Sequence, residues 1–324
     1  MHRKFQFSVN REALHASCIT AKAYNLFVMP EILETPPKQL IEAAATVEPE
    51  LSKRIIEAKL PLNLQEAVLY AVSGGGKRVR PALTLLCCEA VGGTWNDAIA
   101  AAVAVEYIHC FSLVHDDLPC IDDDELRRGK PTLHIHTNEA MAVLAGDVLL
   151  PLAMQQISNA SHPSDLEVQL CHTLSSATVE MVGGQVYDTL GGLPDSLSDL
   201  KGLECIHQNK TGSLIHGACK MGALCGHANK KQLQAIDTFG YSIGLMFQIV
   251  DDLIDLQSPT HHVGKATGKD AAAGKTTYPG VLGVEASKAA VERLKNQAKT
   301  ALTMLGEAGK TLQTLNVWMA CRTR

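Results

Sequence analysis

The chain lacks the marks of two large protein classes. Its 324 residues carry a formal net charge of −5, so the broad positive field of a nucleic-acid-binding protein is missing and we expect no nucleic-acid partner. No apolar stretch reaches the roughly 18 charge-free residues that a membrane span requires, so we expect no transmembrane segment. Where basic residues cluster in this chain, we therefore look for a local anionic ligand or a local acidic partner.

Disulfide and metal-binding cysteine spacings are also missing. The ten cysteines are scattered, with one adjacent pair at Cys87-Cys88 and no CxxC spacing. This pattern predicts buried, reduced thiols in a cytoplasmic protein, with zinc ligation as the weaker alternative. Residues 1–28 carry four basic residues against the single acid Glu12. That bias weakly resembles an organellar transit peptide, but we favour a frayed or misassigned start of the chain.

Aromatic residues make up only 4% of the chain, and alternating helix and strand patterns are absent. Apolar residues recur three or four positions apart in long segments, which predicts helices over 97–118, 139–157, 165–182 and 235–256. Turn-forming residues separate the helices, at 74–76, 92–93, 119, 161–163, 191–194 and 258–274. No break is long enough for an interdomain linker. We predict an all-α fold, with one large helical bundle over 41–324 after an N-terminal extension over 1–40.

A first acidic segment, 116–125, holds six carboxylates in ten residues. Pro119 cannot continue helical hydrogen bonding, so we expect it to kink the chain and bring Asp122 back beside Asp116. Oxygen-only ligands suit Mg²⁺, which normally shares its coordination shell with substrate phosphate. The cations that follow, Arg127, Arg128 and Lys130, could bind the same phosphate or only neutralise the acids.

A second acidic segment, 251–255, lies within an apolar helical pattern over 244–256. Asp251 and Asp255 are four residues apart and share one helix face. Unpaired charge in such a setting costs several kcal/mol, so these groups must meet a cleft, a partner cation or a metal. A salt bridge to a neighbouring helix is the purely structural alternative.

Glycines 74–76 precede three cations, Lys77, Arg78 and Arg80, in what is structurally a connector between helices. The segment is not a P-loop, because Arg78 replaces the Ser or Thr, Ala71 replaces the first glycine, and no strand precedes it. Further on, Lys210-Thr211-Gly212 opens an apolar helical stretch. Lysines also punctuate the glycine-rich segment beyond the second acidic cluster, where surface lysine is the alternative to phosphate binding.

Seven motifs in order, from about residue 40 to 285, resemble the trans-isoprenyl diphosphate synthase family, and most of all the bacterial-type farnesyl diphosphate synthases. Any one motif is weak, but seven in order are very specific. They are the Gly-Gly-Lys-Arg-x-Arg-Pro segment at 75–81, His109, the first acidic segment with Arg127-Arg128-Gly129, Gly183-Gly184-Gln185, Lys210-Thr211-Gly212, 247–255 and 264–279. Residues 1–40 and the tail 318–324 lie outside the resemblance.

The resemblance implies a prenyltransferase of isoprenoid biosynthesis, with a central cavity in a helical bundle of the isoprenoid synthase type and a homodimer as the usual assembly. Two or three Mg²⁺ ions would be held by Asp116, Asp122 and Asp251, with Asp117 and Asp255 as further candidates. The allylic diphosphate would be bound by Arg127, Lys210, Thr211, Gln248, Lys265 and Lys275. Isopentenyl diphosphate would be bound by Lys77, Arg80, His109 and Arg128. Catalytic roles would fall to Lys210, Thr211 and Gln248.

Product length is predicted from Phe111 and Ser112, which lie about one helical turn before Asp116. In the resembled family, an aromatic residue at the position of Phe111 is typical of farnesyl synthases, since its bulk stops the growing tail. We therefore expect dimethylallyl or geranyl diphosphate to be extended to the C15 product, farnesyl diphosphate. A C20 product, geranylgeranyl diphosphate, is the alternative.

Two other classes compete. A class I terpene cyclase would carry a second metal motif that mixes Asn or Asp with Ser or Thr and Glu, which 251–255 does not, and would have less use for Lys77, Arg80 and His109. A non-catalytic subunit of the family would have an eroded aspartate motif and paired CxxxC segments, whereas both acidic segments are intact and no cysteines are four apart.

Overall fold

The computed structural model describes residues 35–160, 162–257 and 276–322. They belong to one compact unit, Leu33–Arg324. Within these residues the structure is helical except for a two-stranded antiparallel ladder, β1 (Leu126–Arg127) and β2 (Lys130–Pro131), so the predicted all-α fold is confirmed. Lys265 and Lys275, which are predicted to bind the allylic diphosphate, lie outside the described residues.

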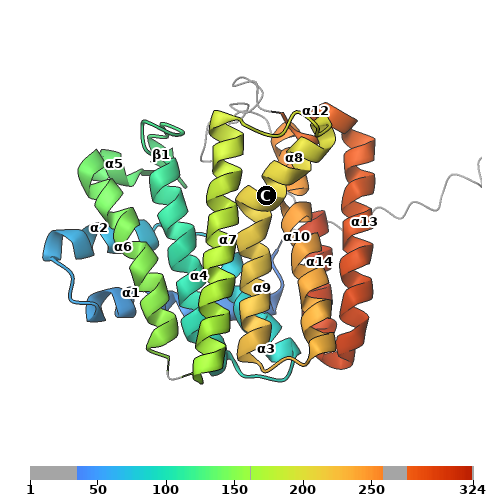
Figure 1. The fold of residues 1–324 in the computed structure, drawn as a ribbon, viewed down its shortest axis with the longest axis horizontal. Coiled ribbons are helices and arrows are strands. Elements are labelled where there is room, and N and C mark those ends of the chain that lie inside the picture. The colour runs from blue at the N-terminus through green and yellow to red at the C-terminus, as the bar shows by residue number, and fades with distance from the viewer. Residues whose placement is uncertain (1–34, 161, 258–275, 323–324) are drawn as a thin grey trace, which may run out of the picture. The chain divides into compact units, whose positions relative to one another are not determined.

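The helices pack side by side in a bundle (Figure 1). The first half of the unit contains α1 (Lys38–Glu57), α2 (Leu62–Val72), α3 (Val79–Ala90), α4 (Trp95–Asp116), α5 (Leu133–His136) and α6 (Glu139–Ser158). The second half contains α7 (Ser164–Leu190), α8 (Asp199–His207), η2 (Gln208–Gly212), α9 (Ser213–Cys225), α10 (Lys230–Gln257), α12 (Tyr278–Leu282), α13 (Val284–Leu302), η3 (Thr303–Gly309) and α14 (Lys310–Cys321).

The four helices predicted from apolar periodicity all form. Their ends lie within two residues of the predicted ones, except that α7 runs to Leu190 instead of 182 and α10 begins at Lys230 instead of 235. Helix α4 shows why: Thr94 and Asp97 form a capping box at its start, and an alanine-rich run follows with almost every side chain buried. Helix α4 packs against α3, α6 and α9, while α9 also packs against α7 and α10. The core therefore surrounds α4 and α9.

Both acidic segments lie at the same end of the bundle. Helices α4 and α10 each end in an acidic segment, and the elements next in the described chain, β1 and α12, both lie at the upper end of the bundle in Figure 1. The expected kink at Pro119 is wrong in detail. Helix α4 stops at Asp116, and a turn in which the Asp122 amide donates to the Asp116 carbonyl at 2.9 Å brings the two aspartates together.

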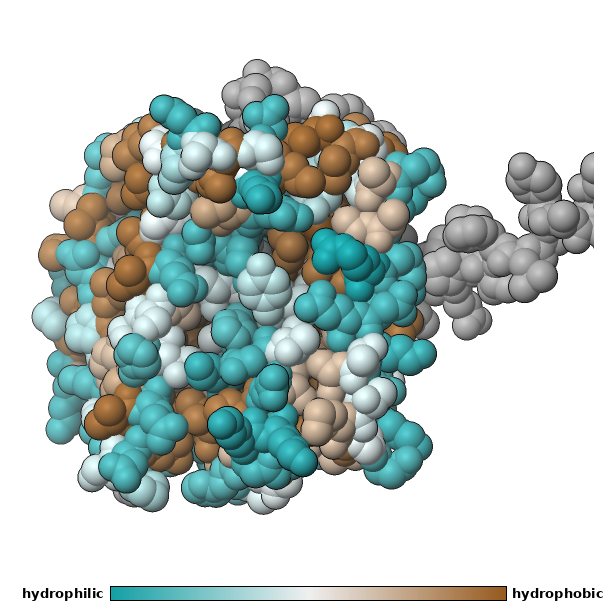
Figure 2. Space-filling view, turned by 45° about the vertical axis from the view of Figure 1, so that its right-hand side comes forward, coloured by the Kyte–Doolittle hydropathy of each residue, from teal (hydrophilic) through white to brown (hydrophobic). Residues whose placement is uncertain are grey.

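Helices α4 and α6 are long and apolar enough, by length and composition, to cross a membrane. The same test is passed by the core helix of a soluble protein, and most of α4 is buried within the bundle. On the face shown in Figure 2, hydrophobic side chains lie among hydrophilic ones over most of the surface.

Candidate active site

The first acidic segment begins with Asp116, the last residue of α4, whose side chain is half-buried. Burial raises the pKa of the Asp116 carboxyl to about 6, opposed by the charge of Lys210 and reinforced by the negative charge of Asp122. Asp116, Asp122 and Lys210 therefore lie within electrostatic reach of one another, although they come from α4, the turn after it and η2. This concentration of negative charge favours a bound cation.

Asp117 faces away from Asp116 and is 3% exposed. Its two carboxylate oxygens accept hydrogen bonds from the Arg127 Nε atom at 2.8 and 2.7 Å, and Arg127 Nη2 also contacts Oδ1. Arg127, on β1, is thereby held beside the first acidic segment. Asp117 is thus the hydrogen-bond partner of this arginine, and its role as a further metal ligand stays a prediction.

The second acidic segment also begins with a partly exposed aspartate, Asp251, followed by a buried one, Asp252. Asp251 keeps 34% of its side chain exposed, and its Oδ1 accepts a hydrogen bond from Arg322 Nη2 at 2.7 Å. Loss of water around the Asp251 carboxyl raises its pKa, whereas the positive charges of Arg322, Lys77 and Arg80 lower it; the effect of burial is the larger. Arg322 also donates to the Phe247 carbonyl at 2.8 Å and lies 4.0 Å over the Phe247 ring. Asp255, one turn further along α10, is exposed.

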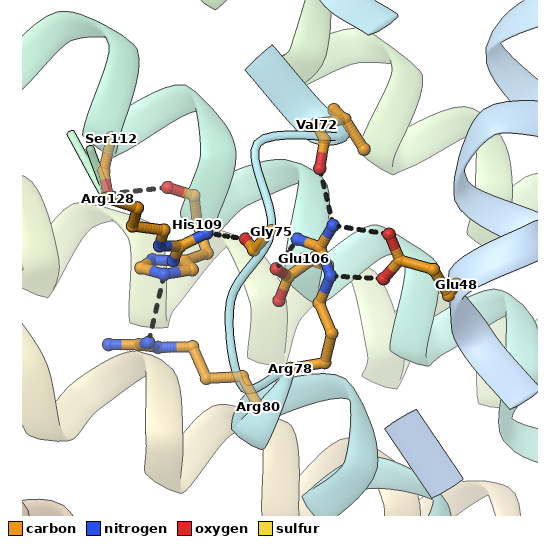
Figure 3. Close-up of polar contacts among 9 residues, drawn as sticks. All are labelled: Glu48, Val72, Gly75, Arg78, Arg80, Glu106, His109, Ser112 and Arg128. Carbon is orange, nitrogen blue, oxygen red and sulfur yellow. Dashed lines mark hydrogen bonds and ion pairs between the residues drawn. The ribbon is translucent and has the colours of Figure 1, made fainter. Parts of the chain in front are cut away.

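Three of the predicted isopentenyl diphosphate ligands gather at the start of α3, where Figure 3 shows Arg128, His109 and Arg80 one above another. Arg80 Nη1 lies 3.3 Å from His109 Nε2. A guanidinium only donates, so Nε2 accepts and the imidazole proton sits on Nδ1. Loss of water and the charges of Arg80 and Arg128 hold the pKa of His109 well below its usual value. Arg80 Nε is buried without a hydrogen-bond partner among the described residues, as expected of a donor that awaits an anion.

The glycine-rich connector is shaped around these cations. Arg128 Nη1 donates to the Gly75 carbonyl, and a Cβ atom on Gly76 would lie 2.5 Å from the same guanidinium. Gly76 also has a φ of +129°, which side chains with a Cβ rarely adopt. Glycine is therefore required where the connector passes Arg128.

Arg78 does not join this basic group but points the other way (Figure 3). It is 4% exposed and donates to Glu48 on α1 at 2.6 and 3.0 Å, to Glu106 on α4 at 2.7 Å and to the Val72 carbonyl at 2.6 Å. This buried ion cluster ties three helices to the connector. Arg78 thus positions its neighbours Lys77 and Arg80.

Lys210 and Thr211 lie in η2, a π-helical turn inside a continuous run from α8 to α9. The prediction that Lys210 opens a helix is therefore wrong, because the sequence pattern does not reveal a π turn. Lys210 Nζ pairs with Asp188 on α7 at 2.5 Å. A Cβ atom on Gly184 would lie 2.2 Å from the Lys210 amide nitrogen, so this glycine lets α7 pack directly on the η2 backbone.

Thr211 and Gln248 are joined by a hydrogen bond of 3.0 Å from Thr211 Oγ1 to Gln248 Oε1. Gln248 Nε2 in turn donates to Asp252 Oδ1 at 3.1 Å. Burial raises the pKa of Asp252 to about 6, although the hydrogen bonds from the Tyr278 amide and Gln248 lower it. The predicted catalytic pair is therefore assembled between η2 and α10.

The predicted chain-length residues lie on α4. Phe111 is buried, and its ring packs edge-on against His115 with 5.0 Å between ring centroids. His115 Nε2 reaches the Val143 carbonyl on α6 at 3.1 Å. Ser112 Oγ donates to the His109 carbonyl at 3.0 Å. The Phe111 ring thus packs against the residue that joins α4 to α6.

Comparison with known proteins agrees with this geometry. The family model described as polyprenyl synthetase matches residues 61–314, which is most of the chain. The chain belongs to the polyprenyl synthetase family. This polyprenyl synthetase is 44% identical over 263 residues to geranylgeranyl pyrophosphate synthase 4 of Arabidopsis thaliana, covering 80% of this chain and 70% of the relative. It is 43% identical over 247 residues to the chloroplastic geranylgeranyl pyrophosphate synthase of Catharanthus roseus, covering 75% and 69%.

Solved structures share the fold of this polyprenyl synthetase. An FPP/GFPP synthase from Zymomonas mobilis is 32% identical with a TM-score of 0.75, over 87% of this chain and 97% of that chain. A geranylgeranyl pyrophosphate synthase is 27% identical with a TM-score of 0.78, over 88% and 99%. The chain is therefore a prenyltransferase of isoprenoid biosynthesis with the isoprenoid synthase fold.

The acidic segments of this polyprenyl synthetase fit the magnesium that the family implies. Asp116, Asp122 and Asp251 offer only carboxylate oxygens, and burial raises the pKa of Asp116 as expected of an acid short of counter-charge. No group of three or more His, Cys, Asp or Glu residues among those described is close enough to bind an ion without other ligands. Such a donor set suits Mg²⁺ that completes its shell with substrate phosphate and water.

Sequence reasoning missed Glu48, Glu106, Asp188, Asp252 and Arg322, all of which hold a predicted site residue or its neighbour. One signal could have found Glu106, since it is the only charged residue in the apolar run 98–115 of α4. A lone charge in such a run predicts a buried ionic partner.

Proposed function

We propose that the chain is a magnesium-dependent geranylgeranyl diphosphate synthase that extends an allylic diphosphate with isopentenyl diphosphate. The supporting observation is the meeting of two acidic segments and two basic groups at one end of the bundle. Arg127 and Lys210 flank the first acidic segment, while Lys77 and Arg80 lie within electrostatic reach of Asp251. Two diphosphates could thus be bound side by side.

Mg²⁺ held by Asp116, Asp122 and Asp251 would offset the charge of the allylic diphosphate. Arg127 and Lys210, with Lys265 and Lys275, hold this group as its carbon–oxygen bond breaks and the electron pair leaves with diphosphate. Isopentenyl diphosphate, held by Lys77, Arg80, His109 and Arg128, attacks the allylic carbon through its alkene. A carbon–carbon bond forms, and a proton is then lost. No protein nucleophile is needed, but water must be excluded from the carbocation.

The C20 product is favoured by the relatives in Arabidopsis thaliana and Catharanthus roseus, which are named geranylgeranyl pyrophosphate synthases. The C15 product is the second candidate, because the buried Phe111 ring occupies the α4–α6 side where a long tail would need room. The test incubates purified protein with Mg²⁺, dimethylallyl diphosphate and labelled isopentenyl diphosphate, and separates the products by chromatography. We expect mainly C20, and a dominant C15 product would reject the C20 assignment.

We propose a homodimer as the working assembly. Helix α7 exposes a run of apolar side chains three or four residues apart, at Val179 (72%), Val182 (45%), Val186 (43%) and Leu190 (79%). An apolar stripe of this kind is typical of a protein interface. Light scattering coupled to gel filtration should give twice the mass of the chain, and Val186→Glu should shift the protein toward the monomer. A monomeric wild-type protein would reject the dimer.

Organellar import by residues 1–28 is supported by several relatives whose names include "chloroplastic". The sequence itself favours a cytoplasmic protein, from its cysteine pattern and from the interpretation of residues 1–28 as a frayed or misassigned start. A fluorescent fusion of the full chain would place it in an organelle if import operates, and a fusion that lacks residues 1–28 should then stay in the cytosol.

A further inference from the structure

The two neighbouring aspartates of the second acidic segment have different surroundings. Adjacent residues on a helix point about 100° apart. Asp251 accordingly keeps 34% of its side chain exposed, while the Asp252 side chain keeps 8%. The two carboxylates therefore cannot serve the same ligand equally well.

Three protein groups lie against the Asp252 carboxylate. Oδ1 accepts from Gln248 Nε2 at 3.1 Å, and Oδ2 accepts from the Tyr278 backbone amide at 2.8 Å. His207 Nε2 lies 3.6 Å from Oδ2. The Asp252 carboxylate thus lies among groups from α10, α12 and α8.

These contacts fix the direction of a chain of hydrogen bonds. An ionised carboxylate only accepts, so the Gln248 side chain must turn its NH₂ group toward Asp252. Its carbonyl oxygen then faces Thr211, whose hydroxyl must donate, at 3.0 Å. With its proton committed to Gln248, the Thr211 oxygen keeps its lone pairs for the side away from Gln248.

We propose that Asp252 is a positioning residue rather than a metal ligand, and that it acts through Gln248 to keep the Thr211 lone pairs turned toward the reacting allylic group. The inference rests on the proposed prenyl transfer, in which positive charge develops on the allylic carbon. A hydroxyl oxygen stabilises that charge, whereas a hydroxyl proton destabilises it.

Asp117 provides an independent parallel. It is also the second aspartate of an Asp-Asp pair, it is buried, and it holds a substrate-binding candidate, Arg127, with both oxygens. In both acidic segments the first aspartate is the more exposed of the two, and the second is buried against a functional side chain.

The test exchanges the carboxylate at position 252 and the amide at position 248 in the chain of hydrogen bonds. In Asp252→Asn, the Tyr278 amide still needs the oxygen of the new side chain, so the new NH₂ group faces Gln248 and donates to its carbonyl. Gln248 then turns its NH₂ toward Thr211, and the Thr211 hydroxyl must accept. We expect kcat to fall on the order of 10²-fold with KM nearly unchanged. In the double variant Asp252→Asn with Gln248→Glu, the carboxylate at 248 accepts from both neighbours and restores the Thr211 direction. We expect at least a tenfold recovery of kcat.

Calorimetric titration with Mg²⁺ and inorganic diphosphate separates positioning from metal binding. Affinity should stay within about twofold of the wild type in Asp252→Asn and fall strongly in Asp251→Asn. Should Asp252→Asn fold poorly, as judged by its melting temperature, Gln248→Met breaks the same link and should lower kcat.

Loss of diphosphate binding in Asp252→Asn, or no recovery in the double variant, would overturn the positioning role while leaving prenyl transfer by the wild type intact. A wild type without any turnover would overturn both the positioning role and the proposed function.

Discussion

The contact between Gly184 and the η2 backbone leads to a sharp prediction for Gly184→Ala. The new Cβ atom would lie 2.2 Å from the Lys210 nitrogen and 2.6 Å from its Cα, where ordinary contact begins at 3.4 Å. Helix α7 or η2 must therefore move by about 1 Å, and overpacking of this kind costs about 1–3 kcal/mol. Alanine returns up to about 1 kcal/mol through helix propensity, so we expect a net loss of about 1–2 kcal/mol in unfolding free energy.

The same displacement should affect catalysis, because Lys210 and Thr211 lie on the element that must move. A shift of about 1 Å in positioning groups costs on the order of 10²-fold in turnover. Urea unfolding followed by circular dichroism measures the stability, and incorporation of labelled isopentenyl diphosphate measures the turnover.

Gly183→Ala is the matched control. It adds the same methyl group one residue earlier in α7, where nothing lies within 4 Å of the new Cβ atom. We expect it to stabilise the protein by roughly 0.5–1 kcal/mol and to leave turnover unchanged. If Gly184→Ala matched Gly183→Ala in both measurements, the close packing of α7 on η2 would be refuted.

Three further predictions follow from buried groups. Arg78→Met should lower the unfolding free energy by about 3–5 kcal/mol, because Glu106 is left buried without its partner, and Glu106→Gln in the same chain should recover part of this loss in urea denaturation. Burial lowers the pKa of His207 to about 4, so its neutral form contributes stability above pH 6.5 that is lost as the pH falls toward 4. Relative to wild type, His207→Asn should therefore gain up to about 3 kcal/mol between pH 7 and pH 4, and a flat difference would contradict this. Phe111→Ala should lengthen the main product by at least one five-carbon unit, whereas an unchanged product would remove Phe111 from the wall.

Most of the fold was predictable because long alanine-rich and leucine-rich segments have a clear helical period. The predicted start of α4 at 97 lies two residues after its observed start at Trp95. What the pattern did not predict is the π turn over 208–212, since a change in backbone hydrogen bonding leaves the side-chain spacing nearly unaltered.

The residues of the site were likewise predictable in part. Asp116, Asp122, Lys77 and Arg80 stand out in the sequence because charge is concentrated beside apolar helices. Their partners are distant along the chain, as Arg322 is from Asp251, so only tertiary packing pairs them. The tail, which lies outside the resemblance, thus contributes a cation to the second acidic segment.

The most direct test of the account measures transfer of label from isopentenyl diphosphate to an allylic diphosphate by wild type, Asp116→Ala and Asp251→Ala, each with Mg²⁺ and with a chelator. We predict magnesium-dependent transfer by the wild type and a loss on the order of 10²-fold or more in each variant. Unchanged transfer in either variant, or transfer that survives the chelator, would contradict the claim that the two acidic segments form one magnesium-dependent site.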